Sequence, residues 1–463
     1  MKKRTFLKLS AALAAGTVIS PMTSWEQGEK LQNWAGNIEY STSNLYAPAS
    51  IEQVREFVKK YNKLKVLGTR HCFNRIADST DRFISLRGLP PLMELDPATH
   101  TVTVGAGVTY GQLGPWLDSK GFALHNLASL PHISVAGAVT TGTHGSGVGN
   151  GSLSTAVTAL ELVTADGEVH HLSRAKDGED FRAAVIGLGG IGVLTKVTLD
   201  IQPTYKVRQD VYEHLPWQQL KDHFEEIVSA GYSVSLFTDW ASEYLNEVWI
   251  KSRMDAAGAP APVGATGSAG TTQPIAGAPS FFGATRATKN LHPIADLSAE
   301  NCTEQMGVPG PWYDRLPHFK MGFTPSSGKE LQSEYFVPHQ HAVEAMLAIA
   351  RMGKEISPHL LITEIRTVAA DDLWMSPCYR QPCVTIHFTW KQDWPAVSRL
   401  LPLIEKELAP FNARPHWGKL FTMPPSRLKE LYTQLPAFIQ LLTRYDPHGK
   451  FRNHFLDSTI FGS

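Results

Sequence analysis

The first part of the chain alternates between helical and extended hydrophobic patterns. From residue 50 to residue 61, apolar side chains recur at the three- and four-residue spacing of an amphipathic helix. Ser50 and Gln53 stand at capping-box spacing where this helix would begin. Further elements are predicted as strands at 64–67, 82–86 and 101–104, and as a helix at 110–120 that Gly121 ends. This alternation indicates an α/β or α+β fold.

The later part of the chain continues to mix helices and strands. A hairpin is predicted where Asp166 and Gly167 separate two apolar runs at 158–164 and 168–172. The other predicted elements are helices at 217–230, 342–352, 394–408 and 426–443, and strands at 232–237, 247–251, 360–367 and 384–390. Residues 256–284 are rich in Ala, Gly, Pro and Thr, so we expect a surface excursion within this second half.

The loop after the strand at 64–67 carries the first candidate chemistry. It begins with Gly68, which allows a sharp turn or a close approach to a ligand, and it presents His71 between Arg70 and Cys72. A neutral histidine can act as a nucleophile. An ordinary loop with a solvated histidine is the alternative for this segment considered alone.

A second unusual stretch runs from residue 127 to residue 147. It is small, hydroxylated and rich in glycine, and we expect neither a core helix nor a regular strand there. Free backbone N–H groups and hydroxyl donors are typical of a pyrophosphate cradle. A flexible surface loop is the alternative.

Residues 187–192 match the G-x-G-x-x-G pattern of nicotinamide dinucleotide sites. Such a site needs a strand before the glycines and a helix after them. Here residues 193–201 are β-branched and alternate, which predicts a strand. We therefore reject the nicotinamide interpretation.

Two strands of the second half present polar side chains on one face. Because strand side chains alternate, Glu364 and Arg366 share a face of one strand, while Thr385, His387 and Thr389 share a face of the other. If the strands are neighbours, these groups converge on one patch, which Lys419 could join. A solvated sheet face with one surface ion pair is the alternative.

Composition narrows the class of protein. The chain has 463 residues, which suggests about two or three domains. Lys+Arg and Asp+Glu are both 43, a balance that argues against a nucleic-acid partner. No His/Cys spacing suggests a metal site. Cys378 and Cys383 are close enough in sequence to bridge or to remain two free thiols.

The N-terminus predicts export. Lys2, Lys3 and Arg4 precede a short apolar stretch, which is typical of a signal and too short for a membrane span. Residues 3–8 (KRTFLK) resemble a twin-arginine signal with Lys in the first Arg position. We expect a leader over 1–25 and a periplasmic protein; an uncleaved anchor is the alternative.

Taken together, the motifs resemble those of FAD-linked oxidases of the vanillyl-alcohol oxidase superfamily, and most closely those of the alditol oxidases, which neighbour the aldonolactone oxidases. They occur in the family's order from about residue 34: the His71 loop, 128–147, 364–366, 387–389, 416–419 and 446–451. The resemblance implies an α+β fold. A two-subdomain PCMH-type FAD-binding domain would span 34–204. A substrate domain, with an antiparallel sheet flanked by helices and a C-terminal segment returning to the flavin, would span 205–463.

The resemblance also implies a cofactor site. His71 corresponds to the histidine that is bonded covalently to the flavin 8α-methyl group, and Cys72 stands where the family commonly has serine. The remaining implied FAD contacts are Val66, Leu67, Gly68, Thr69, Arg70, Ser129, Ser134, Val135, Ala136, Gly137, Ile191 at the adenine side and His416 at the isoalloxazine edge.

The same resemblance implies a polyol site and a reaction. Glu364, Arg366, Thr389, Lys419 and Ser129 resemble the polyol-binding set, and Gln332 and His387 are expected in the same pocket. Arg366 and Lys419 would stabilise the alkoxide that develops as a hydride leaves for the flavin, and Glu364 would orient Arg366 or accept a hydroxyl. Molecular oxygen would then be reduced to hydrogen peroxide. We expect a monomer without a stable protein partner.

Two alternatives stay open at this point. An aldonolactone oxidase or dehydrogenase would share most of these motifs, although residues 129–132 and 304–309 look more like those of alditol oxidases. A non-catalytic exported flavoprotein or sugar-binding protein is a different class. Ala128 stands where the family controls oxygen access, and it does not decide between oxidase and dehydrogenase.

Overall fold

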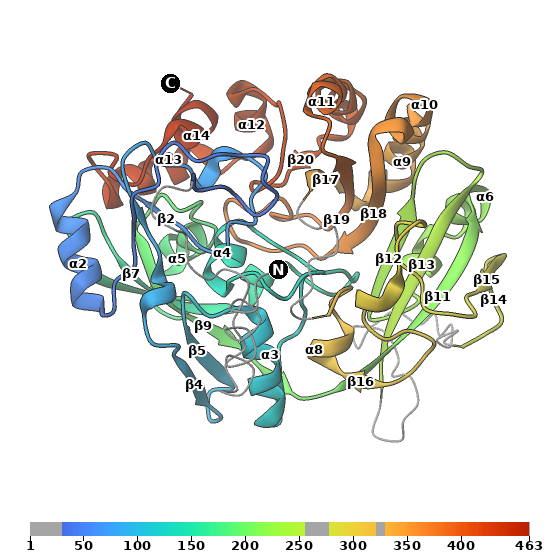
Figure 1. Ribbon diagram of the computed structural model, residues 1–463, viewed down its shortest axis with the longest axis horizontal. Helices are drawn as coiled ribbons and strands as arrows, with labels where there is room; N and C mark the ends of the chain where they lie inside the picture. The colour runs from blue at the N-terminus through green and yellow to red at the C-terminus, as the bar shows by residue number, and fades with distance from the viewer. Residues whose placement is uncertain (1–29, 255–276, 321–328, 463) are drawn as a thin grey trace, which may run out of the picture.

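The computed structural model describes residues 30–254, 277–320 and 329–462. The predicted leader at 1–25 and most of the predicted excursion at 256–284 lie outside these residues. Figure 1 shows the N-terminal half at the left and a large sheet at the right, with the C-terminal helices above both.

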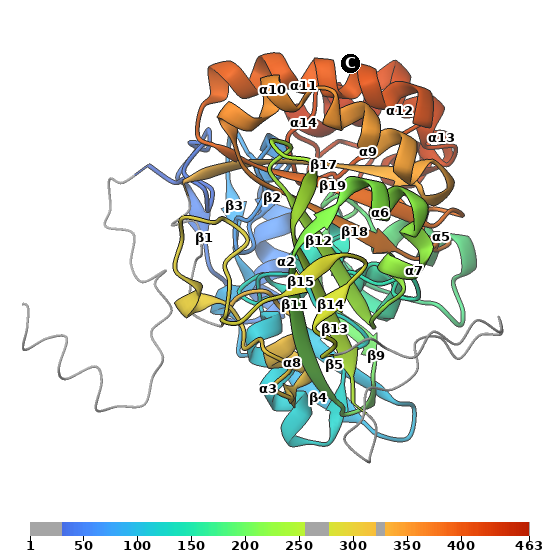
Figure 2. The same cartoon turned by 90° about the vertical axis from the view of Figure 1, so that its right-hand side faces the viewer.

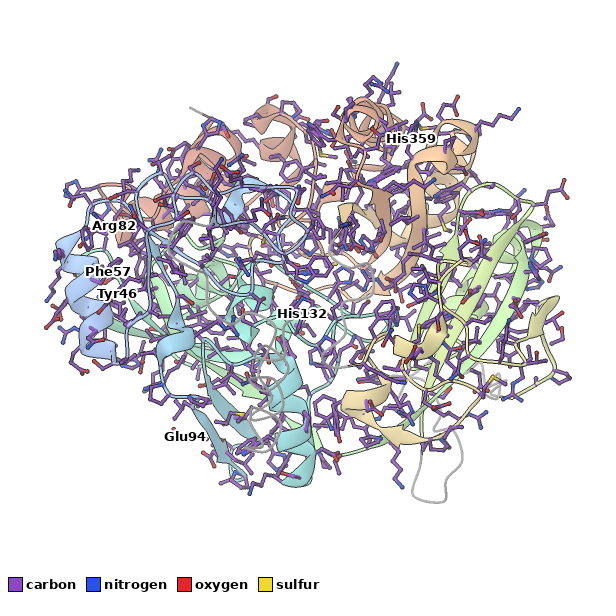
Figure 3. The ribbon with its side chains drawn as sticks, in the orientation of Figure 1. Tyr46, Phe57, Arg82, Glu94, His132 and His359 are labelled. Carbon is purple, nitrogen blue, oxygen red and sulfur yellow. The ribbon has the colours of Figure 1, made fainter. Side chains whose placement is uncertain are left out.

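The N-terminal segment forms a small parallel sheet beside one helix. Strands β1 (Leu45–Tyr46), β3 (Phe83–Ile84) and β2 (Lys65–Val66) lie side by side in that order. Helix α2 (Ile51–Lys60) packs its buried Val54, Phe57 and Val58 inward, and the Ser50 side chain accepts a hydrogen bond from the Gln53 backbone N–H. The predicted start of this helix is thus confirmed. Tyr46 stacks on Phe57 at 4.5 Å between ring centroids, and both are labelled beside α2 in Figure 3.

A five-stranded antiparallel sheet follows, in the order β4-β5-β9-β7-β8. Its strands are β4 (Met93–Asp96), β5 (Thr101–Gly105), β7 (Val157–Val163), β8 (Val169–Ser173) and β9 (Val193–Asp200), with helices α3 (Tyr110–Ser119) and α5 (Gly178–Val185) in the same region. The glycine run 187–192 lies between α5 and β9, so a helix precedes it and a strand follows it. This order is the reverse of a nucleotide-binding βα turn, and the rejection of the nicotinamide interpretation is confirmed.

The stretch 127–147 contains a short helix that the sequence interpretation excluded. Helix α4 (Val135–Thr140) buries Val135, Ala138 and Val139. The prediction was wrong because alanine and valine next to small residues supply enough apolar surface for one and a half turns, which tertiary packing then stabilises. The remainder of the stretch has no regular structure.

The second half is built on one ten-stranded sheet. Its order is β14-β15-β11-β13-β12-β18-β19-β17-β20, with β16 paired to β11 off this path. The strands are β11 (Lys206–Pro216), β12 (Ser233–Thr238), β13 (Tyr244–Arg253), β14 (Ser280–Phe281), β15 (Ala284–Arg286), β16 (Gly310–Pro311), β17 (Glu330–Pro338), β18 (Leu360–Val368), β19 (Cys383–Lys391) and β20 (Arg414–Pro415). A separate two-stranded pair, β6 (Phe122–Ala123) with β10 (Gln202–Pro203), lies where the chain passes from the first part to this sheet.

The helices of the second half include α9, α11, α12 and α13, which lie together at the top of the view in Figure 2, and α9 packs against β17 and β19 of this sheet. Their bounds are α6 (Trp217–Asp222), α7 (Phe224–Val228), α8 (Trp312–Arg315), α9 (Ala342–Ala350), α10 (Gly353–Ile356), α11 (Trp394–Leu408), α12 (Pro425–Leu431), α13 (Leu435–Tyr445) and α14 (His454–Leu456). Two predicted single helices, 217–230 and 426–443, are each split in two. The first breaks at His223, whose backbone leaves the helical region, and the second breaks before Leu435 and its following proline.

The C-terminal segment returns to the N-terminal part of the molecule. The Asn453 side-chain amide donates hydrogen bonds to the carbonyl groups of Arg75, Ile76 and Asp78. In Figure 1, α13 and α14 accordingly lie above the small parallel sheet. Within the described residues, none of the helices has the length and apolar character that a bilayer crossing requires.

Candidate active site

One pocket joins the loops of the N-terminal part to the polar face of the large sheet. Of the residues predicted as a site, it is lined by Val66, Leu67, Gly68, Thr69, Arg70, His71, Cys72, Ser129, Ser134, Gly137, Gln332, Glu364, Arg366, His387, Thr389, His416 and Lys419. The structure thus brings together groups that are more than 300 residues apart in the chain. Val135, Ala136 and Ile191 lie outside this lining; Val135 and Ile191 are buried in the core behind it.

A strained turn directs His71 into the pocket. Arg70 has a positive φ of 63°, a conformation that costs energy in a residue other than glycine. The Arg70 carbonyl accepts a hydrogen bond from the Trp34 backbone N–H, which holds the turn. The His71 ring then packs against Trp34, at 4.4 Å between centroids, and against His132, at 5.0 Å. Figure 3 shows His132 near the centre of the molecule.

The surroundings keep His71 neutral. Burial lowers the pKa of its imidazole well below the ordinary value, and the neighbouring His132 and Lys419 act in the same direction. Its Nδ1 lies 3.3 Å from Nε2 of His132. A neutral imidazole is the nucleophilic form of histidine, so the site has the state that attachment to an electrophilic carbon requires.

The pocket fits FAD at two glycines. A Cβ atom at Gly68 would lie 2.9 Å from Oγ of Ser134, and one at Gly137 would lie 2.8 Å from the same atom. Both glycines therefore leave space for the Ser134 hydroxyl, which a larger side chain at either position would displace. Hydroxyl groups of Thr69, Ser134 and Thr140 surround this point, and the site is a backbone-lined cradle of the kind that holds a diphosphate.

The polar face of the large sheet is ordered in cross-strand rows. Glu334 on β17 lies opposite His387 on β19, and His387 lies opposite Glu364 on β18. In the neighbouring rows Gln332 lies opposite Thr389, and Thr385 lies opposite Arg366. The predicted adjacency of these two strands is confirmed, and the alternative of a solvated face is wrong, because Glu364, Arg366, His387 and Thr389 are all buried.

Glu334 is the centre of the charges on this face, and the sequence interpretation missed it. Its carboxylate accepts hydrogen bonds from Lys419 Nζ at 2.7 Å and Arg366 Nη2 at 2.9 Å, and it lies 3.1 Å from His144 Nε2. Burial alone would raise the pKa of Glu334, but Lys419, His144 and Arg366 hold it well below its usual range. The carboxylate is therefore an anion that positions two cations. Polar residues at 330, 332 and 334 alternate in the sequence and could have revealed it.

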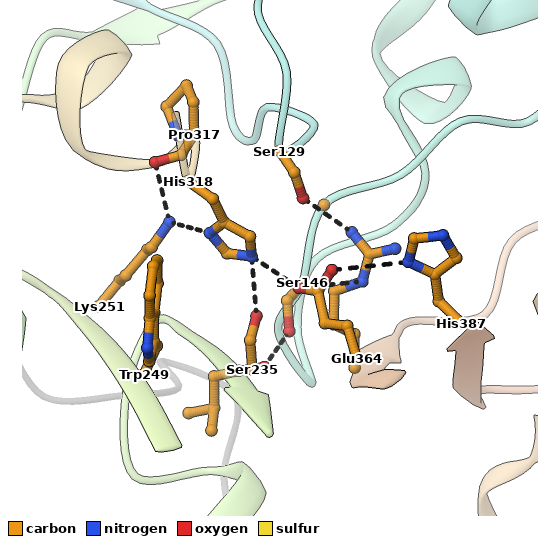
Figure 4. A network of polar contacts seen from close by, with 12 residues as sticks. Ser129, Ser146, Ser235, Trp249, Lys251, Pro317, His318, Glu364 and His387 are labelled. Carbon is orange, nitrogen blue, oxygen red and sulfur yellow. Dashed lines mark hydrogen bonds and ion pairs between the residues drawn. The ribbon is translucent and has the colours of Figure 1, made fainter. Parts of the chain in front are cut away.

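Glu364 belongs to a second network on the same face, shown in Figure 4. Its Oε1 lies 2.6 Å from Nε2 of His318, and Nδ1 of His318 lies 2.9 Å from Nζ of Lys251. Burial alone would raise the pKa of Glu364, but Arg366 and His318 hold it well below its usual range. The distance from its Oε2 to Nδ1 of His387 is 3.9 Å, and this distance is too long for a hydrogen bond. This oxygen is thus available to a ligand.

His387 is a buried ring without a hydrogen-bond partner among the described residues, at either nitrogen. Burial lowers its pKa to about 4, and Lys419 acts in the same direction. A neutral imidazole offers one donor and one acceptor. An orphaned pair of polar atoms beside a pocket is unusual in a native protein, and it indicates a polar ligand there.

The His71 loop also fixes the position of Lys419. The Asn74 side chain donates hydrogen bonds to the carbonyl groups of Trp417 at 2.8 Å and Lys419 at 2.7 Å. The Phe73 backbone N–H donates to the Gly418 carbonyl at 2.8 Å. His71 and Lys419 are thus held on one rigid unit. Cys72 lines the pocket as a free thiol, and Cys378 and Cys383 are also free, so the disulfide alternative is wrong.

No group of three or more His, Cys, Asp or Glu side chains in the part of the chain that the structure describes could hold a metal ion. The arrangement instead offers cations, hydroxyl groups and carboxylates in one pocket. Such a set suits a ligand with several hydroxyl groups, because each hydroxyl both donates and accepts.

Comparison with known proteins agrees with this arrangement. Residues 43–173 match the family model described as FAD binding domain, and residues 324–459 match D-arabinono-1,4-lactone oxidase. An alditol oxidase from Streptomyces sp. is 43% identical over 93% of this chain and 99% of its own. The bovine L-gulonolactone oxidase is 26% identical over 94% of this chain and 99% of its own. A Mycobacterium tuberculosis L-gulono-1,4-lactone dehydrogenase is 28% identical over 91% of this chain and 97% of its own.

The fold also has solved counterparts. The crystal structure of a cholesterol oxidase from B. sterolicum superposes with a TM-score of 0.72 over 93% of this chain and 96% of that chain, at 15% identity. The FAD-binding fold of helices and antiparallel sheets that was expected from the sequence is thereby confirmed.

Proposed function

The chain belongs to the family of FAD-linked alditol oxidases, and from this premise we propose that it oxidises a primary alcohol group of a polyol such as xylitol or sorbitol to the aldehyde of the aldose. The single observation that carries the proposal is the buried, charge-paired face of Glu334, Arg366, Lys419 and Glu364 beside the FAD cradle. When bound, FAD supplies an acceptor for the hydride that leaves the alcohol carbon.

The residues of the sheet would hold the polyol in place. Ser129, Gln332, Thr389 and Glu364 offer donors and acceptors that can fix successive hydroxyl groups, which orients one carbon for reaction. Lys419 and Arg366 bring positive charge to the pocket, where they can stabilise the negative charge that develops on the reacting oxygen. His387 can accept a hydrogen bond from a hydroxyl because its ring is neutral.

His71 is proposed as the point of covalent FAD attachment, with His416 beside the isoalloxazine. The support is its neutral imidazole at the mouth of the cradle and the rigid packing of its ring against Trp34 and His132. A covalent bond would prevent loss of the cofactor. It would also leave the residues at 416–419 in a fixed relation to the ring system, because Asn74 ties the two loops together.

We propose molecular oxygen as the electron acceptor and hydrogen peroxide as the second product, so that the alcohol and O2 give the aldehyde and H2O2. Ala128 lines the pocket beside Ser129. Export to the periplasm by a twin-arginine-like signal, with an uncleaved anchor as the alternative, remains a proposal from the N-terminal sequence. So does the monomeric state without a stable protein partner.

An aldonolactone is the second candidate substrate. The match of residues 324–459 to D-arabinono-1,4-lactone oxidase favours it, because this region supplies most of the pocket's polar face. A lactone presents the same row of hydroxyl groups, and the same cations could stabilise charge on its reacting oxygen.

The test uses the purified, flavin-loaded protein. Acid precipitation will leave the yellow colour in the pellet if FAD is covalent. Anaerobic mixing with xylitol and, separately, with L-gulono-1,4-lactone will bleach the flavin absorbance only with a substrate. Bleaching by xylitol, with peroxide formed on readmission of air, is the expected result. Bleaching by the lactone alone would assign the protein to the aldonolactone oxidases, and no bleaching by either would overturn the proposal.

A further inference from the structure

A buried lysine lies behind the pocket wall and is not explained by substrate contact. Lys251 on β13 has only 1% of its surface exposed. Its ammonium group contacts the carbonyl oxygen of Leu316, the carbonyl oxygen of Pro317 at 3.2 Å and Nδ1 of His318 at 2.9 Å. An ammonium group has three hydrogens, and these acceptors use all of them. All three hydrogens of the Lys251 ammonium group therefore have acceptors, and none of these is a carboxylate among the residues that the structure describes.

These contacts determine the form of the His318 ring. A nitrogen that accepts a hydrogen bond from an ammonium group cannot carry a proton itself. Nδ1 is thus the acceptor, the single ring proton lies on Nε2, and Nε2 donates to Glu364 Oε1 at 2.6 Å. The three groups form a directed chain, Lys251 to His318 to Glu364, that ends at the pocket (Figure 4).

The same segment also reaches Ser129, which lines the pocket from the N-terminal part of the chain. The backbone N–H groups of His318 and Phe319 donate to the Ser129 carbonyl at 3.1 Å and 3.3 Å. His318 therefore contacts both Ser129, from the N-terminal part, and Glu364, from the large sheet. Thr303 supports the segment, because its hydroxyl donates to the Pro317 carbonyl at 2.8 Å.

We propose that Lys251 and His318 are positioning residues for the polyol: Lys251 keeps His318 a neutral Nε2–H donor, so that Glu364 stays a full carboxylate whose second oxygen accepts a substrate hydroxyl. The inference rests on the proposed function and names a determinant of substrate affinity within that site. A protonated His318 would draw the carboxylate charge toward itself and weaken the hydrogen bond from the substrate.

The charges around His318 agree with this role. They come from Lys251 on β13 and from Glu364 and Arg366 on β18; Ser235 on β12 adds a neutral hydroxyl at 3.4 Å from Nε2. Burial, followed by Lys251, lowers the pKa of His318 to about 4, and Glu364 opposes both effects. Without the lysine, only burial and Arg366 would lower the pKa of His318 against the opposing effect of Glu364. The pKa of His318 would then rise toward neutral pH.

Other titratable groups lie near the chain of contacts but do not touch His318. Cys302 lies beside Lys251. Glu247 is on the same strand as Lys251 and accepts a hydrogen bond from the Trp249 ring N–H. Burial lowers the pKa of Lys251 to about 7, with Glu364 opposing. The test is therefore made from pH 7, near the pKa of Lys251, down to pH 5, where Lys251 is charged and His318 is still neutral in the native protein.

The experiment measures polyol binding apart from chemistry. Anaerobic stopped-flow reduction of the bound flavin by xylitol gives the dissociation constant of the polyol and the limiting rate of reduction at each pH. In the native protein the dissociation constant should stay level from pH 7 to pH 5. In Lys251→Met it should match the native value near pH 7 and rise roughly tenfold toward pH 5, as for the weakening of one hydrogen bond to a charged group. The limiting rate should change less.

A double variant identifies the group that titrates. His318→Gln retains an N–H donor for Glu364 but cannot take up a proton, so Lys251→Met/His318→Gln should lose the acid-dependent rise. Lys251→Gln, also neutral, should behave like Lys251→Met and serves if the methionine variant does not fold. Lys450→Met is the matched control: the ammonium group of this lysine also donates to backbone carbonyls, those of Val58 and Ala165, which do not line the pocket. Its variant should show no pH-dependent change in binding.

Each outcome decides the inference separately from the function. Level binding in both neutral Lys251 variants would make this lysine a purely structural residue and overturn the inference. A rise that persists in the double variant would assign the titration to a group other than His318 and would also overturn it. Native protein whose flavin no polyol reduces would instead overturn the proposed function.

Discussion

The Glu334 carboxylate and the Lys419 ammonium group form a hydrogen-bonded ion pair, 2.7 Å from Oε2 to Nζ, at the junction of the large sheet and the loop that follows β20. The glutamate side chain is completely buried, whereas the lysine keeps 13% of its side chain exposed. Glu334 is thus the internal anchor, and Lys419 is the partner that faces the pocket. Arg366 shares the same carboxylate at 2.9 Å.

Replacing Glu334 with glutamine is expected to damage both stability and turnover. The amide would leave Lys419 without its counter-ion and Arg366 with Glu364 alone, and breaking a buried ion pair on one side costs about 3 kcal/mol of unfolding free energy. The pKa of Lys419, already lowered by burial, would fall further because Glu334 raises it. Chemical denaturation and flavin reduction by xylitol measure the two effects. Glu405→Gln is the control, since this buried carboxylate accepts hydrogen bonds from Tyr335 and Thr422, which do not line the pocket, and it should leave turnover nearly unchanged.

Removing the Lys419 ammonium group is expected to reduce the rate and not FAD binding. In Lys419→Ala we expect flavin content near that of the native protein and a limiting rate of reduction lower by at least ~10²-fold, as for the loss of one charge-stabilising donor. The flavin spectrum and anaerobic stopped-flow reduction check this. Near-native turnover would remove Lys419 from the mechanism. Lys391→Ala, at the exposed end of β19, provides a lysine outside the pocket for comparison.

The covalent flavin is expected to depend on His71. In His71→Ala, FAD should bind non-covalently, so acid precipitation should release the yellow colour into the supernatant while the folded protein still binds added FAD. The physical reason is the loss of the neutral nucleophile, because the cradle at Gly68 and Gly137 stays intact. His171→Ala, at a histidine with 71% of its side chain exposed, should keep the colour in the pellet. Colour retained in the pellet of the His71 variant would exclude this attachment point.

Much of the fold and part of the site follow from local patterns in the sequence. The helix after Ser50 and the faces of β18 and β19 were predictable, because capping and strand alternation act over a few residues. Helix α4 was not predictable, because its stability comes from tertiary packing of only six residues. The breaks in 217–230 and 426–443 likewise depend on how the chain turns onto the sheet.

The charge pairing of the site lay beyond sequence reasoning for a different reason. Glu334 contacts His144, Arg366 and Lys419, which are 190, 32 and 85 residues away, and the strand that carries it was not predicted. His318 lies on an irregular segment that has no periodic pattern. Sequence similarity placed Lys419, Arg366 and Glu364 in one pocket, but the buried groups that hold them became visible only when the strands were paired.

The buried neutral histidines are expected to make the protein acid-labile. Burial is the main cause that lowers the pKa of His318 and of His387 to about 4 in the folded protein, whereas an unfolded histidine titrates near ~6.5. Between these values the unfolded chain binds more protons than the folded one, so stability rises with pH and is lost as pH falls below ~6.5, by up to about 1.4 kcal/mol per pH unit for each ring. Glu334 and Glu364, whose pKa values are lowered, add a further loss of stability as the pH falls below ~4.3.

Thermal unfolding from pH 7 to pH 5 should show a falling midpoint, and His318→Gln should make that fall shallower. A midpoint independent of pH over this interval would mean that these rings take up no protons on unfolding, and the neutral state on which the positioning role of His318 depends would have to be abandoned.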